Sequence, residues 1–197
     1  MTIRNSAKEF LDKHLLNKFL NIKTKKTDSD ILISAGLGNQ PSIQSLLIQI
    51  GYAYEDFWND VLSNCNNVTN VLSKDGNTIV VPNKVTGKRK KQATQQIDHL
   101  FKINETYYYR ESKCNLNFDS EKSPSSVNKI ILVANLISNK YNVSLDKVNY
   151  GYFVPVLPYV LEKTKKKAPK IPNQNGVVDL INLIGKENLE FTADEYF

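Results

Sequence analysis

The stretches QQIDHL (Gln95–Leu100) and YYYRESKC (Tyr107–Cys114) decide how this chain is expected to fold. They predict strands over Thr94–Ile103 and Thr106–Asn115, the second favoured by its three consecutive tyrosines. Only Asn104-Glu105 separate the two strands, which is the length of a tight hairpin loop. We therefore predict an antiparallel hairpin at the centre of the fold.

This hairpin is expected to bring three charged side chains together. A two-residue loop sets the register so that Asp98 lies directly opposite Glu111. Side chains alternate along a strand, so Glu111 and Lys113 share a face, and cross-strand partners project to the same side. Two carboxylates and an ammonium group then converge on one patch of sheet. Such an arrangement can hold a divalent cation and activate a water.

The segments around the hairpin predict helices and further strands. Apolar residues recur at helical spacing over Pro41–Val61, and again over Ser123–Tyr141, which opens with a helix-start signal. Short β-branched runs over Val68–Val81 surround Asp75-Gly76, a dipeptide favoured in hairpin turns. Val148–Leu157 is aromatic and β-branched and predicts a last strand. Because a helical connection usually makes the next strand parallel to its neighbour, we predict an α/β (α+β) fold with a mixed central sheet flanked by helices.

The composition is that of an ordinary globular protein with one domain. The chain has 197 residues, of which 41% are hydrophobic and 23% charged, enough to bury a substantial core. No apolar run approaches the roughly 18–20 residues that cross a bilayer. The first ten residues include Arg4, Lys8 and Glu9 and lack an apolar secretory core. We expect a cytoplasmic protein that does not contact membranes.

Positive charge is concentrated in two runs. The formal net charge is +6, which favours polyanionic partners. One basic run lies between Lys84 and Lys91, just before the strand that carries Asp98, and the other lies between Lys163 and Lys170. Taken singly, each run is equally well explained as a solvated loop. Because both runs flank the candidate cation site, we expect them to contact phosphate groups.

Asp98, followed thirteen residues later by Glu111-Ser112-Lys113, resembles the motif of the PD-(D/E)XK nuclease superfamily. The predicted order α-β-β-β-α-β is similar to the core of that superfamily, whose members include the type II restriction endonucleases. Ile97 stands where the motif has its proline, and Ser112 stands where many members have an apolar residue. The resemblance implies a restriction-endonuclease-like catalytic core over residues 41–157. The single nuclease domain, 1–197, would add an N-terminal helical extension (1–40) and a C-terminal appendage (158–197).

The resemblance also implies roles for particular residues. Asp98, Glu111 and Lys113 would be catalytic, and the two carboxylates would ligate Mg²⁺, which prefers hard oxygen ligands. Lys113 would either orient the attacking water and offset charge on the phosphate, or act as a general base. In several members a glutamate on the preceding helix joins the metal site, which makes Glu55 a further candidate ligand; the alternative is a solvated helix carboxylate.

The expected function is Mg²⁺-dependent cleavage of double-stranded DNA at a specific site by a type II restriction endonuclease. A palindromic site would call for a homodimer. The residues expected to contact DNA are Lys88, Arg89, Lys90, Lys91, Asn115, Asn117 and Lys122. The sequence contains no glycine-rich phosphate loop, so no nucleotide cofactor is expected. The alternatives are a structure-specific nuclease such as a junction resolvase, a non-catalytic DNA-binding module with the same fold, and an exposed Glu–Lys pair without function.

Overall fold

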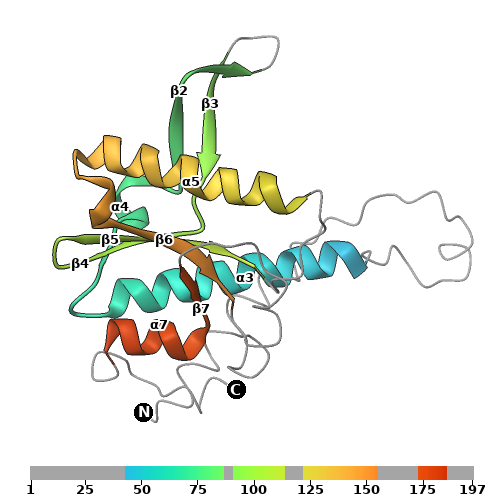
Figure 1. Ribbon diagram of the computed structural model, residues 1–197. Coiled ribbons are helices and arrows are strands. Elements are labelled where there is room, and N and C mark those ends of the chain that lie inside the picture. Colours follow the sequence, from blue (N-terminus) through green and yellow to red (C-terminus); the bar gives the residue numbers. More distant parts are fainter. Residues whose placement is uncertain (1–42, 87–90, 114–121, 155–172, 186–197) are drawn as a thin grey trace, which may run out of the picture. The chain divides into compact units, whose positions relative to one another are not determined.

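The computed structural model describes residues 43–86, 91–113, 122–154 and 173–185 (Figure 1). The chain divides into two units, Met1–Trp58 and Asn59–Phe197, and each is described by itself. The predicted N-terminal extension lies outside the described residues. No helix in the described ranges is both long enough and apolar enough to span a membrane.

The described part of the first unit is a single helical segment. Helix α3 (Ile43–Asn64) begins in this unit and continues into the second. Ala53, Phe57 and Trp58 are buried, as expected for the apolar stripe of an amphipathic helix. The rings of Phe57 and Trp58 pack edge to face with their centroids 5.3 Å apart. The helix predicted for this stretch of sequence is therefore confirmed.

The second unit is built on a mixed five-stranded sheet with the strand order β1-β4-β5-β6-β7 (Figure 1). Its strands are β1 (Thr69–Asn70), β4 (His99–Ile103), β5 (Thr106–Ser112), β6 (Val148–Phe153) and β7 (Asn173–Asn175). The pairs β1–β4 and β4–β5 are antiparallel, whereas β5–β6 and β6–β7 are parallel. The predicted mixed sheet is confirmed, and the specific restriction-endonuclease core stays a prediction.

The β4–β5 hairpin has the register that the sequence predicts. Asn104-Glu105 form the loop, and Asn104 has φ 52°, a left-handed conformation that tight hairpin loops require and that asparagine tolerates. His99 is paired with Arg110. Continuing this register by one residue places Asp98 beside Glu111.

The strand predicted over Thr94–Ile103 is wrong, because this segment forms two strands in different sheets. β3 (Lys91–Gln96) pairs with β2 (Thr78–Thr86) in a separate two-stranded ribbon, and β4 starts only at His99. Ile97 buries its side chain, and the chain bends at Asp98. The Asp98 carboxylate accepts a hydrogen bond from the backbone N–H of Ser112 on β5. In a continuous strand, a backbone carbonyl would accept this hydrogen bond instead.

The hairpin predicted at Asp75-Gly76 is also wrong. Leu72–Asp75 form a short helix, α4, and Gly76 ends it with φ 74° and an N–H bond to the Leu72 carbonyl. Glycine adopts positive φ without strain, so the same dipeptide that suits a hairpin loop also suits the end of a helix. The strands on either side, β1 and β2, belong to different sheets.

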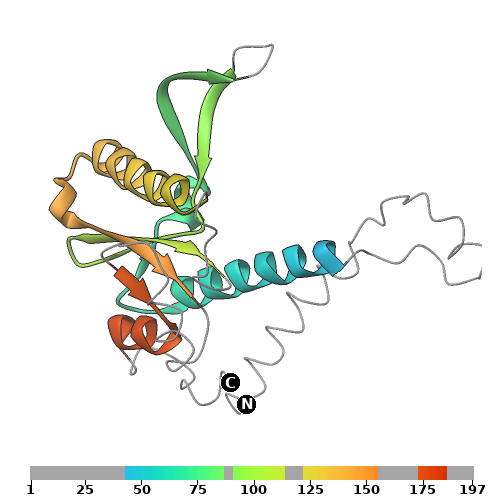
Figure 2. The same ribbon diagram turned by 45° about the vertical axis from the view of Figure 1, so that its right-hand side comes forward.

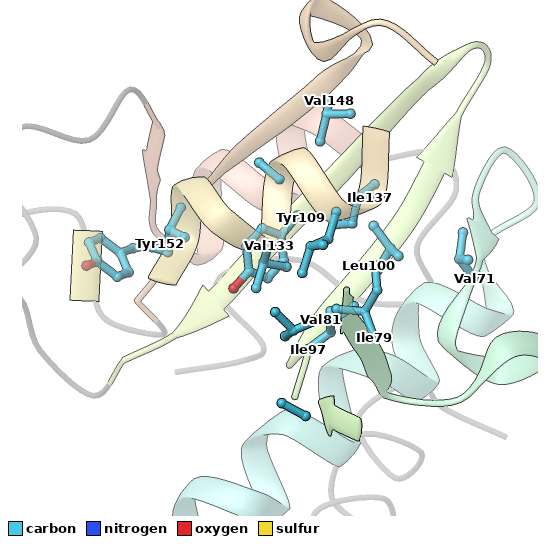
Figure 3. Packing of buried hydrophobic residues seen from close by; sticks show 14 of the residues in the cluster. Val71, Ile79, Val81, Ile97, Leu100, Tyr109, Val133, Ile137, Val148 and Tyr152 are labelled. Atoms are coloured by element: carbon cyan, nitrogen blue, oxygen red, sulfur yellow. The ribbon is translucent and has the colours of Figure 1, made fainter. Parts of the chain in front are cut away.

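Helix α5 (Lys122–Tyr141) lies over one face of the five-stranded sheet, and α7 (Val177–Ile184) lies on the opposite side (Figures 1 and 2). The 3₁₀ turn η1 (Leu145–Lys147) joins α5 to β6. In Figure 3, Val133 and Ile137 reach from α5 toward Tyr109 and Leu100 of the sheet. The same buried cluster includes Ile79, Val81 and Ala93 of the ribbon and Ile97 of the bend. The core therefore fixes α5 against both the sheet and the ribbon.

Strand β7 completes the environment of a buried arginine on β5. The side chain of Arg110 donates from Nε to Asn175 Oδ1 at 2.7 Å and from Nη2 to Asn149 Oδ1 at 2.8 Å. Its Nη1 atom donates to the Asn149 and Tyr109 carbonyls, both at 2.9 Å. Burial lowers the pKa of Arg110 to about 10, so the guanidinium remains charged at neutral pH. The buried guanidinium of Arg110 thus forms its hydrogen bonds with amide and carbonyl oxygens, and none of these partners is a carboxylate.

The parallel pairing of β6 with β7 requires a glycine at position 151. A Cβ added to Gly151 would lie 1.8 Å from the Asn173 carbonyl oxygen, and that neighbour is backbone. We expect Gly151→Ala to lower the free energy of unfolding by roughly 2 kcal/mol or more, measured by urea denaturation. Gly51→Ala in α3 is the matched control: its Cβ would meet no atom within 4 Å. We expect that control to be stabilised by up to about 1 kcal/mol. Wild-type stability of Gly151→Ala would contradict the β6–β7 pairing.

Candidate active site

The centre of the candidate site is the carboxylate of Glu111, a β5 residue that is 3% exposed. Lys113 Nζ donates to Oε1 at 2.9 Å. Lys129 Nζ, from α5, lies 2.7 Å from Oε1 and 2.8 Å from Oε2. The Tyr109 hydroxyl donates to Oε2 at 3.1 Å. A carboxylate has about four lone-pair positions, so these four contacts saturate it.

Asp98 supplies the second carboxylate of the site. Its Oδ2 atom accepts the Ser112 N–H at 2.9 Å, and its backbone carbonyl accepts the side-chain amide of Asn59 at 2.9 Å. Burial, followed by the negative charge of Glu111, raises the pKa of Asp98 from 3.8 to about 6. The structure thus brings the predicted residues Asp98, Glu111 and Lys113 into one electrostatic group.

The lysines determine the charge state of this group. Burial acts to raise the pKa of Glu111, but Lys113 and Lys129 outweigh burial and hold that pKa below its ordinary value. Burial acts to lower the pKa of Lys113, whereas the charges of Glu111 and Asp98 raise it above its ordinary value. At neutral pH, Glu111 is therefore ionised and Lys113 is protonated. Burial and the charge of Glu111 raise the pKa of Tyr109 well above its ordinary value, so the hydroxyl stays protonated and can donate its hydrogen bond to Glu111.

The side chains on the opposite face of β4 and β5 stabilise the fold. His99 is buried, and its ring nitrogens lie 3.0 Å from Asn59 Oδ1 and 2.8 Å from Ser112 Oγ. The His99 ring packs edge to face against Phe153. Burial lowers the pKa of His99 to about 3, which keeps the imidazole neutral in the folded protein. The hydrogen bonds of His99 thus help to fix the hairpin that carries Asp98 and Glu111.

Sequence reasoning missed Lys129. This lysine is half-buried on the side of α5 that carries the buried Ile130 and Val133, where an apolar residue is the rule. A charged residue on the apolar face of a helix is the signal that would have found it, since such a charge needs a buried partner. Ser126 completes the connection: its hydroxyl lies 2.8 Å from the Tyr152 hydroxyl and links α5 to β6.

The structure describes the other predicted site residues only in part. Glu55 is half-buried on α3 in the first unit. Lys91 begins β3 and Lys122 begins α5, but their side chains are not described. The other residues expected to contact DNA lie outside the described residues, namely Lys88, Arg89, Lys90, Asn115 and Asn117.

The two carboxylates fit a divalent cation by their chemistry. They offer hard oxygen ligands, and a bound cation would counter both burial and the charge of Glu111, which together raise the pKa of Asp98. Within the described ranges, no three or more Asp, Glu, His and Cys side chains form a metal-binding group. Asp98 and Glu111 would therefore hold a cation with help from water or substrate oxygens, as Mg²⁺ sites commonly do.

Comparisons of the chain with protein-family models, with curated proteins and with solved structures found no match. The site combines two buried carboxylates, two ammonium groups and one phenol.

Replacing Asp98 by asparagine is expected to stabilise the protein above about pH 6. The pKa of Asp98 is about 6 in the folded state and near 3.8 in the unfolded chain. The folded state therefore binds the proton more tightly, and stability falls as pH rises from 4 through 6. The amide oxygen of the introduced asparagine can still accept the Ser112 N–H but carries no charge. We expect Asp98→Asn to gain about 1–3 kcal/mol at pH 8 in urea denaturation, and to lose most of this gain at pH 4.

Glu105→Gln is the control for this prediction. The Glu105 side chain is 84% exposed in the hairpin loop, where loss of charge should change stability by less than about 0.5 kcal/mol at either pH. A destabilised Asp98→Asn at pH 8 would contradict the electrostatic description of the site.

Proposed function

We propose that this protein is a Mg²⁺-dependent endonuclease that cleaves double-stranded DNA at a short specific site, as type II restriction endonucleases do. The observation that carries the proposal is the charge arrangement around Glu111. A buried carboxylate lies beside a second buried carboxylate, Asp98, and within 2.9 Å of the ammonium groups of Lys113 and Lys129. Buried ionised groups are costly, and pairs of carboxylates with opposed pKa shifts are typical of catalytic sites.

The reaction requires a cation and a positive charge close to the phosphate. Asp98 and Glu111 would hold Mg²⁺, which when bound polarises a phosphate oxygen and makes a coordinated water more acidic. The chain's own contribution is to keep both carboxylates at one place. The Ser112 N–H fixes Asp98, and the Tyr109 hydroxyl fixes Glu111.

Lys113 would act through its charge. Its pKa lies above the ordinary value, so the amine is protonated at neutral pH and is not free to act as a base. Its side chain is 31% exposed, which leaves the ammonium group accessible to an anionic substrate. In the proposed reaction, Lys113 therefore stabilises the negative charge that develops on the scissile phosphate.

DNA contact is supported by the charge of the ribbon region. From Gly76 to Ile97 the sequence has five lysines and arginines and no aspartate or glutamate. Figures 1 and 2 show that β2 and β3 extend past α5, away from the five-stranded sheet. A two-stranded ribbon has a width that the major groove admits, and basic side chains position such a ribbon by contacting phosphates. Two copies related by a two-fold axis would place one catalytic site on each strand of a palindrome.

Removing either carboxylate should abolish cleavage while DNA binding persists. We expect Asp98→Asn and Glu111→Gln to lower the rate of cleavage by at least about 10³-fold, because each removes a carboxylate that would hold the cation that stabilises the transition state. The measurement is digestion of long linear DNA in MgCl₂, with sequencing of the fragment ends and an anisotropy assay of binding. Near-normal cleavage by either variant would remove the assignment of the site.

The pattern of products separates the alternatives. Discrete fragments with a common end sequence support a restriction endonuclease. Selective nicking of four-way junctions would support a junction resolvase, and salt-sensitive binding without metal-dependent cleavage would support a non-catalytic module.

Replacing Lys88, Arg89, Lys90 and Lys91 together by glutamine should weaken binding to every DNA sequence. Each phosphate contact that is lost reduces the slope of log K against log salt by about 0.9, so the quadruple variant should flatten the slope by up to about 3–4. The control removes four charges from the second basic run, at Lys163, Lys165, Lys166 and Lys167. An unchanged slope in the first variant would show that this segment is only a solvated loop.

A further inference from the structure

Donors among the described residues fill the four acceptor positions of the Glu111 carboxylate. Oε1 accepts from Lys113 and Lys129, and Oε2 accepts from Lys129 and Tyr109. A carboxylate that already makes four hydrogen bonds can ligate a metal only if one donor withdraws. Cation binding at Glu111 is therefore an exchange of partners and not a simple addition.

The three donors differ in how easily they can withdraw. Tyr109 is fully buried in the core beneath α5 and cannot turn away without opening it. Lys113 occupies one position on Oε1 only, so its departure frees a single oxygen. Lys129 contacts both oxygens, as a chelated cation would, and its side chain is 31% exposed. Its departure alone opens one position on each oxygen.

We propose that Lys129, which contacts both oxygens of Glu111, competes with a divalent cation for this carboxylate, so that Lys129 sets the metal affinity of the site. This inference rests on the proposed metal site of Asp98 and Glu111. It assigns to α5 a function that the Asp98–Glu111–Lys113 motif does not contain.

Exchange at Glu111 also couples the metal to the substrate. Helix α5 is held in place by the core and by the Ser126–Tyr152 hydrogen bond. Lys129 therefore stays close to the site after its ammonium group leaves Glu111. Its ammonium group, released from Glu111, then adds positive charge where an anionic phosphate must arrive. Because coupling between ligands is reciprocal, DNA should in turn strengthen metal binding.

Two variants of Lys129 should change metal affinity in opposite directions. Lys129→Met keeps the length of the side chain and removes the competing charge, so Mn²⁺ should bind at least about tenfold more tightly, within the range of typical couplings between sites. Lys129→Arg places a guanidinium fork on the carboxylate, holds Glu111 bidentately and should weaken Mn²⁺ binding. The measurement is calorimetric titration of MnCl₂ into the full chain without DNA, after circular dichroism has verified folding.

Lys140→Met is the matched control, since Lys140 is also on α5 but pairs with Asp75 at 3.4 Å. Its Mn²⁺ affinity should equal that of the wild type. Equal or weaker Mn²⁺ binding by Lys129→Met would overturn the role of Lys129 and leave the metal site standing. No Mn²⁺ binding by any form of the protein would overturn the metal site as well. If Lys129→Met does not fold, Lys129→Arg decides: weaker binding supports the exchange, and unchanged binding overturns it.

Discussion

A carboxylate that is removed from water must replace its hydration with donors that the fold holds in place, and Glu111 sets this requirement for the second unit. Among its donors, Tyr109 lies on β5 and Lys113 directly follows this strand, whereas Lys129 lies on α5. β5 alone cannot satisfy the carboxylate, so α5 has to lie over the sheet at a particular place along its length. The apolar contacts that fix α5 and the ion pairs at Glu111 therefore support each other.

The charge of Asp98 lowers the stability of the fold, whereas the ion pairs of Glu111 support it. Its carboxylate is buried beside a second negative charge, and what it gives the fold directly is a hydrogen bond from the Ser112 backbone. A residue selected for stability alone would be uncharged at this position. The chain also leaves the two-stranded ribbon and enters the five-stranded sheet at the bend of Asp98. The residue that bears the destabilising charge is therefore also the point where the chain changes sheets. Such local costs are characteristic of functional sites.

Local rules predicted the parts of the fold that depend on neighbouring residues. The two-residue loop fixed the β4–β5 register, and apolar periodicity located α3 and α5. What failed depended on distant partners. Gly76 suits both a hairpin and a helix end, and only the pairing of β1 with β4 and of β2 with β3 distinguishes them. Lys129 escaped notice because its partner lies eighteen residues away on another element. The side chain that breaks the strand at Asp98 bonds to Ser112, which only the assembled hairpin brings near.

The environment of Arg110 has a consequence for biosynthesis. The last of its partners to be made, Asn175, lies 65 positions later in the chain. A polypeptide leaves the ribosome from its amino end, so the hairpin emerges with an interior cation whose Nε donor has not yet met its acceptor. Arg110 therefore obtains the Asn175 acceptor only when β7 has paired with β6, and we expect a chain that lacks β7 to be less stable.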